Sequence, residues 1–194
     1  MLRFPVNVAL AEVPVNALPL LDDTDFKTRE TGVAYNAAGM DLVWNFVSAT
    51  GVFTQTAVTP TTGGAYDWLH QGDGIYTIEI PKSGGASINN DTVGTGWFSG
   101  VATGVLPWTG PICEFVLGGE ITSGTPSTTA FICAQLTSAN TDQYKDAYVN
   151  LLTGTCAGAV KQITALTPGS DTVTCDALPA TPSVGDTFLI INGA

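Results

Sequence analysis

The chain is short of charged side chains, and of positively charged ones above all. Its 194 residues include six Lys and Arg against seventeen Asp and Glu, which gives a net charge of -11. Only 12% of the residues are charged, compared with roughly 25% in an average soluble domain. Proteins that bind nucleic acid need basic side chains to neutralise phosphates. The composition therefore argues against a nucleic-acid partner.

Long apolar runs are also missing. No stretch of about 18 apolar residues, the length that crosses a membrane as a helix, occurs in the sequence. The first ten residues carry one positive charge but no apolar segment of signal length, and Glu12, Pro14 and Asn16 interrupt the next ten. We therefore expect neither a membrane partner nor a secretory signal.

Histidine is almost absent, and the cysteines lack the spacing of a zinc site. The four cysteines are Cys113, Cys133, Cys156 and Cys175, and none forms a C-x-x-C pair. A metal site of His and Cys ligands is therefore not expected. We interpret the cysteines as small buried apolar side chains, with a disulfide between neighbouring strands as the alternative.

His70 is the only histidine, so it is the only side chain that could serve as the base of a Ser–His or Cys–His catalytic site. It follows Trp68 and precedes Gly72, which favours a position at a strand end or in a loop. No G-x-S-x-G segment accompanies it. We assign His70 a surface or packing role.

Other motifs of enzymes are incomplete. The glycines of residues 94–100 are similar to a dinucleotide-binding loop, but the last spacing is one residue too long and no helix pattern follows. Several carboxylates could supply a pair of the kind that glycosidases use, although spacing alone does not locate one. These carboxylates are Asp41, Asp67, Asp73, Glu79 and Asp91. We therefore expect no catalytic residue, no cofactor and no metal.

The acidic segment of residues 22–25 suggests a calcium-binding loop. If Asp23 is the first ligand, then Lys27, Thr28 and Ala34 occupy the fifth, sixth and twelfth positions, where an EF-hand requires an oxygen ligand, a glycine and a glutamate. The segment fails at all three positions. It is more typical of a turn in which aspartate side chains accept hydrogen bonds from nearby backbone N–H groups.

The residues that the chain does favour indicate an all-β fold. Apolar residues make up 44% of the sequence, and β-branched residues and glycine recur in short runs between turn signals. Residues 148–153 also have apolar side chains at helical spacing, but we favour a strand there. The expected strands span residues 17–21, 41–47, 51–58, 75–80, 92–104, 111–117, 130–136, 148–153, 160–166, 172–175 and 187–191.

The composition predicts two β domains. Residues 118–129 are rich in Gly, Ser and Thr, which is typical of a linker or exposed loop. We predict an N-terminal β-sandwich domain over residues 1–120 and a smaller C-terminal β-barrel or sandwich module over residues 125–194. Residues 1–19 contain three prolines and form either an extended arm that orders on contact with a partner or an edge strand.

All four tryptophans precede residue 118. Large aromatic side chains serve in cores, in subunit interfaces and in stacking on sugar rings. We favour the first two uses and keep sugar stacking as an alternative. The tryptophans are Trp44, Trp68, Trp97 and Trp108.

Several segments of the chain resemble structural proteins of tailed bacteriophages. In the first half, these are the turn DDTDFKT of residues 22–28, the strand LVWNF of residues 42–46 and the segment GDGIY of residues 72–76. GWF of residues 96–98 and GVLPW of residues 104–108 follow in the same order. The second half is similar to a small β module of phage virions through the segments LTGTCAG (152–158), KQIT (161–164) and PSVGDTF (182–188).

The resemblance implies a non-enzymatic structural protein on the surface of the phage particle, assembled in the host cytoplasm. It implies a capsid decoration or cement protein, a homotrimer that binds the major capsid protein or other virion proteins and stabilises the head between capsid subunits. The alternative is a tail or head-fibre adaptor with a receptor- or carbohydrate-binding face. A hydrolase on a β scaffold is a third class of function.

Overall fold

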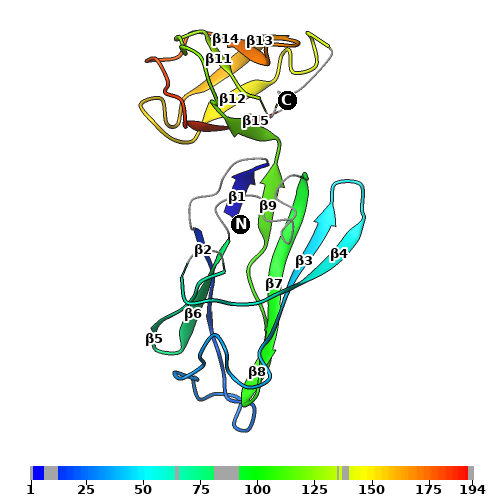
Figure 1. Ribbon diagram of the computed structural model, residues 1–194, viewed down its shortest axis with the longest axis vertical. Helices are drawn as coiled ribbons and strands as arrows, with labels where there is room; N and C mark the ends of the chain where they lie inside the picture. The colour runs from blue at the N-terminus through cyan, green and yellow to red at the C-terminus, as the bar shows by residue number, and fades with distance from the viewer. Residues whose placement is uncertain are drawn as a thin grey trace. The chain divides into compact units, whose positions relative to one another are not determined.

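The computed structural model describes residues 2–6, 13–63, 66–80, 92–134, 136 and 140–191 (Figure 1). All regular secondary structure in these residues is β-strand, as the sequence predicted. No helix in this part of the chain is long and apolar enough to cross a membrane. The prediction of an all-β fold is therefore confirmed.

The chain divides into two compact units, which are described separately. The first comprises Met1–Arg3 and Ala9–Phe115, and the second comprises Phe4–Val8 and Val116–Ala194. The chain passes from the first unit into the second for the last time at Val116, before the Gly- and Ser-rich segment in which we expected the boundary.

The six-stranded sheet that contains β3 and β7 is called the larger sheet. It has β4 at one edge and β1 at the other. Its strands run in the order β1 (Leu2–Pro5), β9 (Cys113–Val116), β7 (Gly94–Ala102), β3 (Asp41–Ser48) and β4 (Phe53–Val58), and β8 (Val105–Thr109) also pairs with β7. Neighbouring strands are antiparallel where β3 meets β4 and where β7 meets β3, β8 and β9. The β3–β4 and β3–β7 registers contain no bulge.

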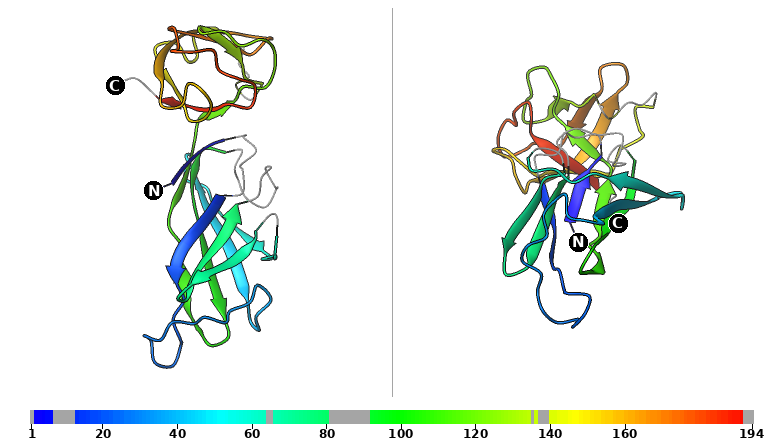
Figure 2. Two further views of the ribbon diagram at one scale, coloured as in Figure 1. Left: turned by 90° about the vertical axis from the view of Figure 1, so that its left-hand side faces the viewer. Right: turned by 60° about the horizontal axis from the view of Figure 1, so that its bottom comes forward.

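The smaller sheet of the first unit has three strands. Its order is β2 (Val13–Pro19), β6 (Ile75–Ile80) and β5 (Trp68–Gly72). Bulges interrupt the pairing of β6 with both neighbours. The smaller sheet lies against the larger one in Figure 2, so the first unit has the two-layer arrangement of a β-sandwich.

Aromatic rings fill the core of the first unit. The Trp44 ring lies 4.7 Å from that of Phe98 and 6.0 Å from that of Phe115, measured between centroids. Across the smaller sheet, Trp68 stacks on Tyr76 at 5.1 Å and lies 5.8 Å from Trp108 of β8. Trp44, Phe98 and Phe115 are almost completely buried, so the aromatic residues of this unit serve mainly as core.

Glycines in β7 make room for these rings. A Cβ atom on Gly96 would lie 2.1 Å from the Trp44 ring, and one on Gly100 would lie 2.5 Å from the Trp108 ring. Both distances are shorter than any real contact between carbon atoms. The rings of Trp44 and Trp108 therefore occupy the space that side chains at positions 96 and 100 would need. The Gly-rich sequence of β7 thus follows from packing and not from a ligand-binding loop.

The second unit contains one six-stranded sheet. Its order is β10 (Gly118–Glu120), β15 (Thr187–Ile191), β12 (Tyr148–Leu151), β13 (Val160–Thr167), β14 (Thr172–Cys175) and β11 (Ala130–Ile132). Just after β10, Thr122 donates its N–H to the carbonyl of Ile132 in β11 at 2.9 Å. The two ends of the sheet are thereby joined, which favours the barrel among the predicted alternatives.

All four cysteines are buried and none forms a disulfide. Cys113 belongs to the first unit, and Cys133, Cys156 and Cys175 lie in the core of the second beside Phe131 and Phe188. Burial raises the pKa of the Cys113 thiol to about 11. The interpretation of the cysteines as small buried apolar side chains is confirmed, and the disulfide alternative is wrong.

The prediction that residues 118–129 form a linker or exposed loop is wrong for their first part. Residues 118–120 are strand β10, and Ile121 is completely buried. A Cβ atom on Gly118 would lie 2.3 Å from the carbonyl oxygen of Phe188. Glycine is therefore required by the close approach of β10 to β15, a reason that composition alone does not reveal.

Candidate functional site

The acidic loop after β2 is a turn held by its own aspartate side chains, and Asp23 also donates its N–H to the carbonyl of Gly104. The Asp22 carboxylate accepts hydrogen bonds from the N–H groups of Thr24 at 2.6 Å and Asp25 at 2.9 Å, and from the Thr24 hydroxyl. The Asp25 carboxylate in turn accepts hydrogen bonds from the N–H groups of Lys27 and Thr28. The predicted turn is confirmed, because these aspartates bind neighbouring backbone in the manner expected.

These hydrogen bonds also change the acidity of Asp22. The Thr24 hydroxyl contributes most, followed by the N–H groups of Asp25 and Thr24, and together they lower the pKa of Asp22 to about 2. The charged form is thus favoured by local hydrogen bonding.

His70 lies within β5, not at the strand end or in the loop that we expected. Its ring stacks on Tyr76, with 4.8 Å between centroids, and its Nε2 accepts a hydrogen bond from the N–H of Gly74 at 3.1 Å. These contacts hold the β5–β6 turn, which agrees with the packing role assigned to His70.

The carboxylates considered for glycosidase chemistry are spread over different elements. Asp41 begins β3, Glu79 belongs to β6, and Asp73 lies in the β5–β6 turn, where it pairs with Arg29. Asp67 immediately precedes β5, and Asp91 lies outside the described residues. Among the described side chains, no group of three or more His, Cys, Asp or Glu could hold a metal ion.

The most distinctive surface of the first unit is the outer face of the larger sheet, opposite the aromatic core. We define it by the side chains that alternate with the buried ones along β3, β4 and β7. Its members are Asp41, Val43, Asn45, Val47, Phe53, Gln55, Ala57, Thr95, Trp97, Ser99 and Val101. Only Asp41 is charged, although the whole chain carries a net charge of -11.

A polar network lies at the centre of this face. Asn45 is only 4% exposed; its Nδ2 donates to Ser99 Oγ at 2.9 Å, and its Oδ1 accepts from Gln55 Nε2 at 2.9 Å. The network links side chains of β4, β3 and β7. The buried amide of Asn45 is thus hydrogen-bonded on both sides, and none of the three side chains is charged.

Apolar side chains surround the network. Phe53 and Val101 are 52% and 40% exposed, and the Phe53 ring stacks on that of Trp97 with 6.3 Å between centroids. An exposed surface with apolar side chains and few charges is typical of the central part of a protein–protein interface. Scattered exposed apolar side chains are common, but here they share one face of one sheet.

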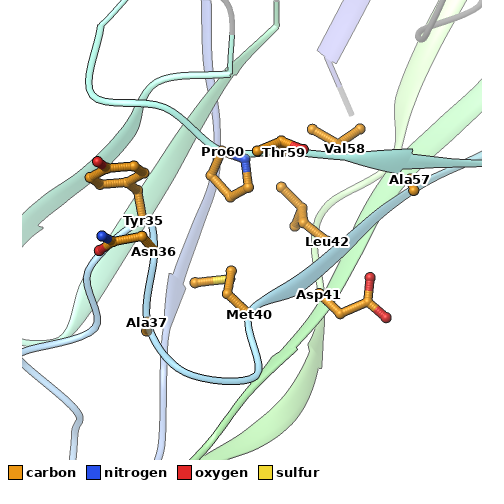
Figure 3. A pocket seen from close by; sticks show the side chains of 10 residues that line it. All are labelled: Tyr35, Asn36, Ala37, Met40, Asp41, Leu42, Ala57, Val58, Thr59 and Pro60. Atoms are coloured by element: carbon orange, nitrogen blue, oxygen red, sulfur yellow. The ribbon is translucent and has the colours of Figure 1, made fainter.

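Two open pockets adjoin the face near the start of β3. One, of about 390 Å³, is bounded by Tyr35, Met40 and Pro60, whose side chains gather around the space in Figure 3. The other, of about 320 Å³, lies beside Val101 and Trp108. Asp41 borders both, and its carboxylate points away from the first (Figure 3). Their walls are mixed apolar and polar.

The second unit exposes a smaller apolar set on its sheet. Tyr148 of β12 is 37% exposed and lies directly opposite Ile191 of β15, and Val160 of β13 lies on the neighbouring strand. These three residues occupy adjacent strands in the order β15, β12 and β13. They form a second, smaller group of exposed apolar side chains.

The sequence did not single out the outer face as a site. Both faces of residues 41–47 are largely apolar, since Val43 and Val47 alternate with the buried Trp44 and Phe46. The pattern does not show which face remains uncovered.

No family model, no curated protein and no solved structure matches the chain.

Proposed function

We propose that the chain is a non-enzymatic structural protein of a tailed-phage virion, a decoration or cement protein that binds between capsid subunits. The observation that carries the proposal is the outer face of the larger sheet, where apolar side chains surround a hydrogen-bonded polar centre and only Asp41 is charged. A protein that acts by adhesion needs such a surface, because burial of apolar area drives association. The resemblance of residues 17–117 to phage structural proteins indicates that the partner is the major capsid protein or another virion protein.

The charge of the chain supports the same role. Electrostatic repulsion between copies with a net charge of -11 keeps free subunits soluble before assembly. It also keeps them away from packaged DNA, whose phosphates are negative. On the capsid, the outer face provides contact area in which Asp41 is the one charged side chain, so binding requires little of the charge desolvation that would oppose it.

Electron cryomicroscopy of the virion tests the location of the protein. We expect density for the chain at many equivalent places over the shell, with the outer face against the major capsid protein. A few copies at a tail or head fibre would instead support the second candidate, an adaptor with a receptor-binding face. Its motivating observation is the pair of open pockets beside the sheet.

Particle stability tests the cement role independently. Phage particles that lack the protein should release DNA at a lower temperature than complete particles, because each copy adds contact area between subunits. Addition of purified protein should restore the heat resistance. Equal DNA release with and without the protein would contradict the proposal.

A matched pair of variants connects the surface to binding. Val101→Asp places a charge within the outer face, and we expect it to reduce binding to capsids at least about tenfold because the carboxylate must be desolvated. Val184→Asp changes a side chain that is 52% exposed in the second unit, and it should bind as the unchanged protein does. Equal binding by both variants would exclude the outer face as the contact surface.

The proposed particle form is a homotrimer, which the resemblance implies. The molar mass in solution, measured by light scattering, should then correspond to three chains or a multiple of three.

An assay for polysaccharide cleavage tests the third class of function, a hydrolase. Cleavage by the purified protein that is abolished by substitution of His70 or of a single carboxylate would contradict the structural role and support a hydrolase.

A further inference from the structure

Strand β4 is an edge strand whose outward side has no neighbour among the described strands. It is last in the order of the larger sheet, and Figure 1 shows it at the margin of that sheet. Ser48 donates its N–H to the carbonyl of Val52, and Ala49 donates its N–H to the carbonyl of Val93 on the opposite side of β3. Together these bonds show which residues of β3 direct their backbone N–H and C=O groups toward β4 and which direct them toward β7.

The alternation of an antiparallel ladder then gives the direction of each backbone group. Thr54, Thr56 and Val58 lie opposite Phe46, Trp44 and Leu42 and exchange hydrogen bonds with β3. The N–H and C=O groups of the intervening residues point away from the sheet. These residues are Phe53, Gln55 and Ala57, and all three side chains are exposed.

Other edges of the described sheets carry features that discourage pairing. Strand β2 contains Pro14 and a bulge, β8 contains Pro107 and a bulge, and the pairing of β5 is interrupted by a bulge. Strand β1 ends in Pro5. Strands β10 and β11 are only three residues long. Prolines, bulges and short length are the usual protection of an edge.

Strand β4 lacks all of these. Its six residues, FTQTAV, include no proline and no charged side chain, and its register with β3 has no bulge. Regular, uncharged edges of this kind are templates for another strand. We propose that β4 pairs with β4 of a second copy of this chain, so that the larger sheets of two copies form one continuous antiparallel sheet.

The sequence of the strand fits a two-fold pairing. With Gln55 opposite Gln55 of the second copy, Phe53 of each copy lies opposite Ala57 of the other, and a large ring meets a small side chain. The outward groups of Phe53, Gln55 and Ala57 then form three hydrogen-bonded pairs, each with two bonds. The strand itself carries no charged side chain, so no like charges lie opposite each other along this edge.

This contact goes beyond the proposed capsid role and is independent of it. If the chain also forms trimers, the two-fold contact joins copies of neighbouring trimers. The association in solution therefore includes a two-copy step, in which β4 of one copy pairs with β4 of another.

Sedimentation equilibrium of the full chain tests the pairing. We expect a reversible association with a two-chain step that strengthens with concentration. Hydrogen exchange should show that the amides of Phe53, Gln55 and Ala57 become protected as concentration rises, whereas those of Thr54 and Thr56 are protected throughout. A chain that remains monomeric at about 1 mM, or a closed trimer with these three amides unprotected, overturns the inference and leaves the capsid role untouched.

Two variants and a control locate the contact. Ala57→Pro removes an outward N–H that β3 does not use, which deletes two bonds of the symmetric pair and should weaken association about 30-fold. Gln55→Lys places like charges directly opposite each other and should also weaken it. Val101→Lys adds the same charge on the outer face but away from the edge, so it should associate normally. Unchanged association of Ala57→Pro, with its fold shown intact by circular dichroism, would overturn the proposal.

Discussion

At the scale of single residues, the packing of the first unit's core depends on a glycine, Gly96. The Trp44 ring occupies the position that a Cβ of Gly96 would need, at 2.1 Å. We expect Gly96→Ala to lower the free energy of unfolding of the first unit by about 1–3 kcal/mol, because an overfilled core must shift its neighbours. Chemical denaturation followed by tryptophan fluorescence measures this change.

Gly32 provides the control. No atom lies within 4 Å of the place where its Cβ would be built, so Gly32→Ala should leave the free energy of unfolding nearly unchanged. If both alanine variants were equally stable, the packing of Trp44 against Gly96 would not limit this core. The double variant Gly96→Ala with Trp44→Phe should recover part of the loss, since the smaller ring vacates the space.

The Asp22 carboxylate gives a prediction about pH. Its pKa falls from 3.8 to about 2 because the Thr24 hydroxyl and the N–H groups of Asp25 and Thr24 bind the charged form. A group with a lowered pKa stabilises the folded state above its unfolded pKa, and that contribution is lost as the pH falls from about 4 through about 2. An NMR titration of the Asp22 side chain should have its midpoint at about 2.

Variants separate the causes of this shift. Thr24→Val removes the hydroxyl that contributes most, so the pKa of Asp22 should rise toward 3.8. Asp22→Asn removes the titrating group, so the stability of this variant should depend less on pH between about 4 and 2. A midpoint at the ordinary value in the unchanged protein would contradict the hydrogen-bonded turn.

At the scale of elements, one buried amide links three strands. Asn45 hydrogen-bonds Ser99 of β7 and Gln55 of β4. Asn45→Ala should lower the free energy of unfolding by about 1–3 kcal/mol, because hydrogen bonds made by a side chain with almost no solvent contact are lost. Gln55→Ala should cost less than about 0.5 kcal/mol, since Gln55 is exposed and surface changes are usually small. Similar losses in both variants, measured by chemical denaturation, would contradict this ranking and mean that the hydrogen bond between Gln55 and Asn45 accounts for most of the loss.

Several elements could be predicted from the sequence because their side chains carry a periodic signal. Strand β6 alternates Tyr76, Ile78 and Ile80 with more polar residues, and it lies where expected. Strands β5, β8 and β10 were not predicted. In β8, Pro107 is typical of a strand end but is accommodated at an edge, and in β10 two glycines leave no side-chain pattern. Such elements are specified by close contacts with distant strands.

The candidate site was likewise predictable only in part from the sequence. Alternation along β3 identifies Trp44 and Phe46 as a buried pair, but it does not distinguish a covered sheet face from an open one. That distinction depends on where the β2–β6–β5 sheet lies, and this sheet forms between residues far apart in the chain. The unprotected edge of β4 likewise emerges only once the strand order is known.

At the scale of the whole molecule, each unit has a core of its own. Phe131 and Phe188 pack at 5.1 Å in the second unit among residues that belong to that unit alone. All four tryptophans belong to the first unit, and three of the four cysteines belong to the second. The chain therefore contains separate natural probes of its two cores.

These probes allow the cores to be perturbed one at a time. Ile163 is completely buried in the second unit, so Ile163→Ala should lower the stability of that unit by about 2–5 kcal/mol through a cavity. Labelling of Cys133, Cys156 and Cys175 by a thiol reagent should then occur at lower denaturant, while the tryptophan transition stays in place. Gly96→Ala should produce the reverse pattern, because distant sites with no shared partners act additively. A single transition that both substitutions shift equally, by both probes, would show that the two cores unfold as one.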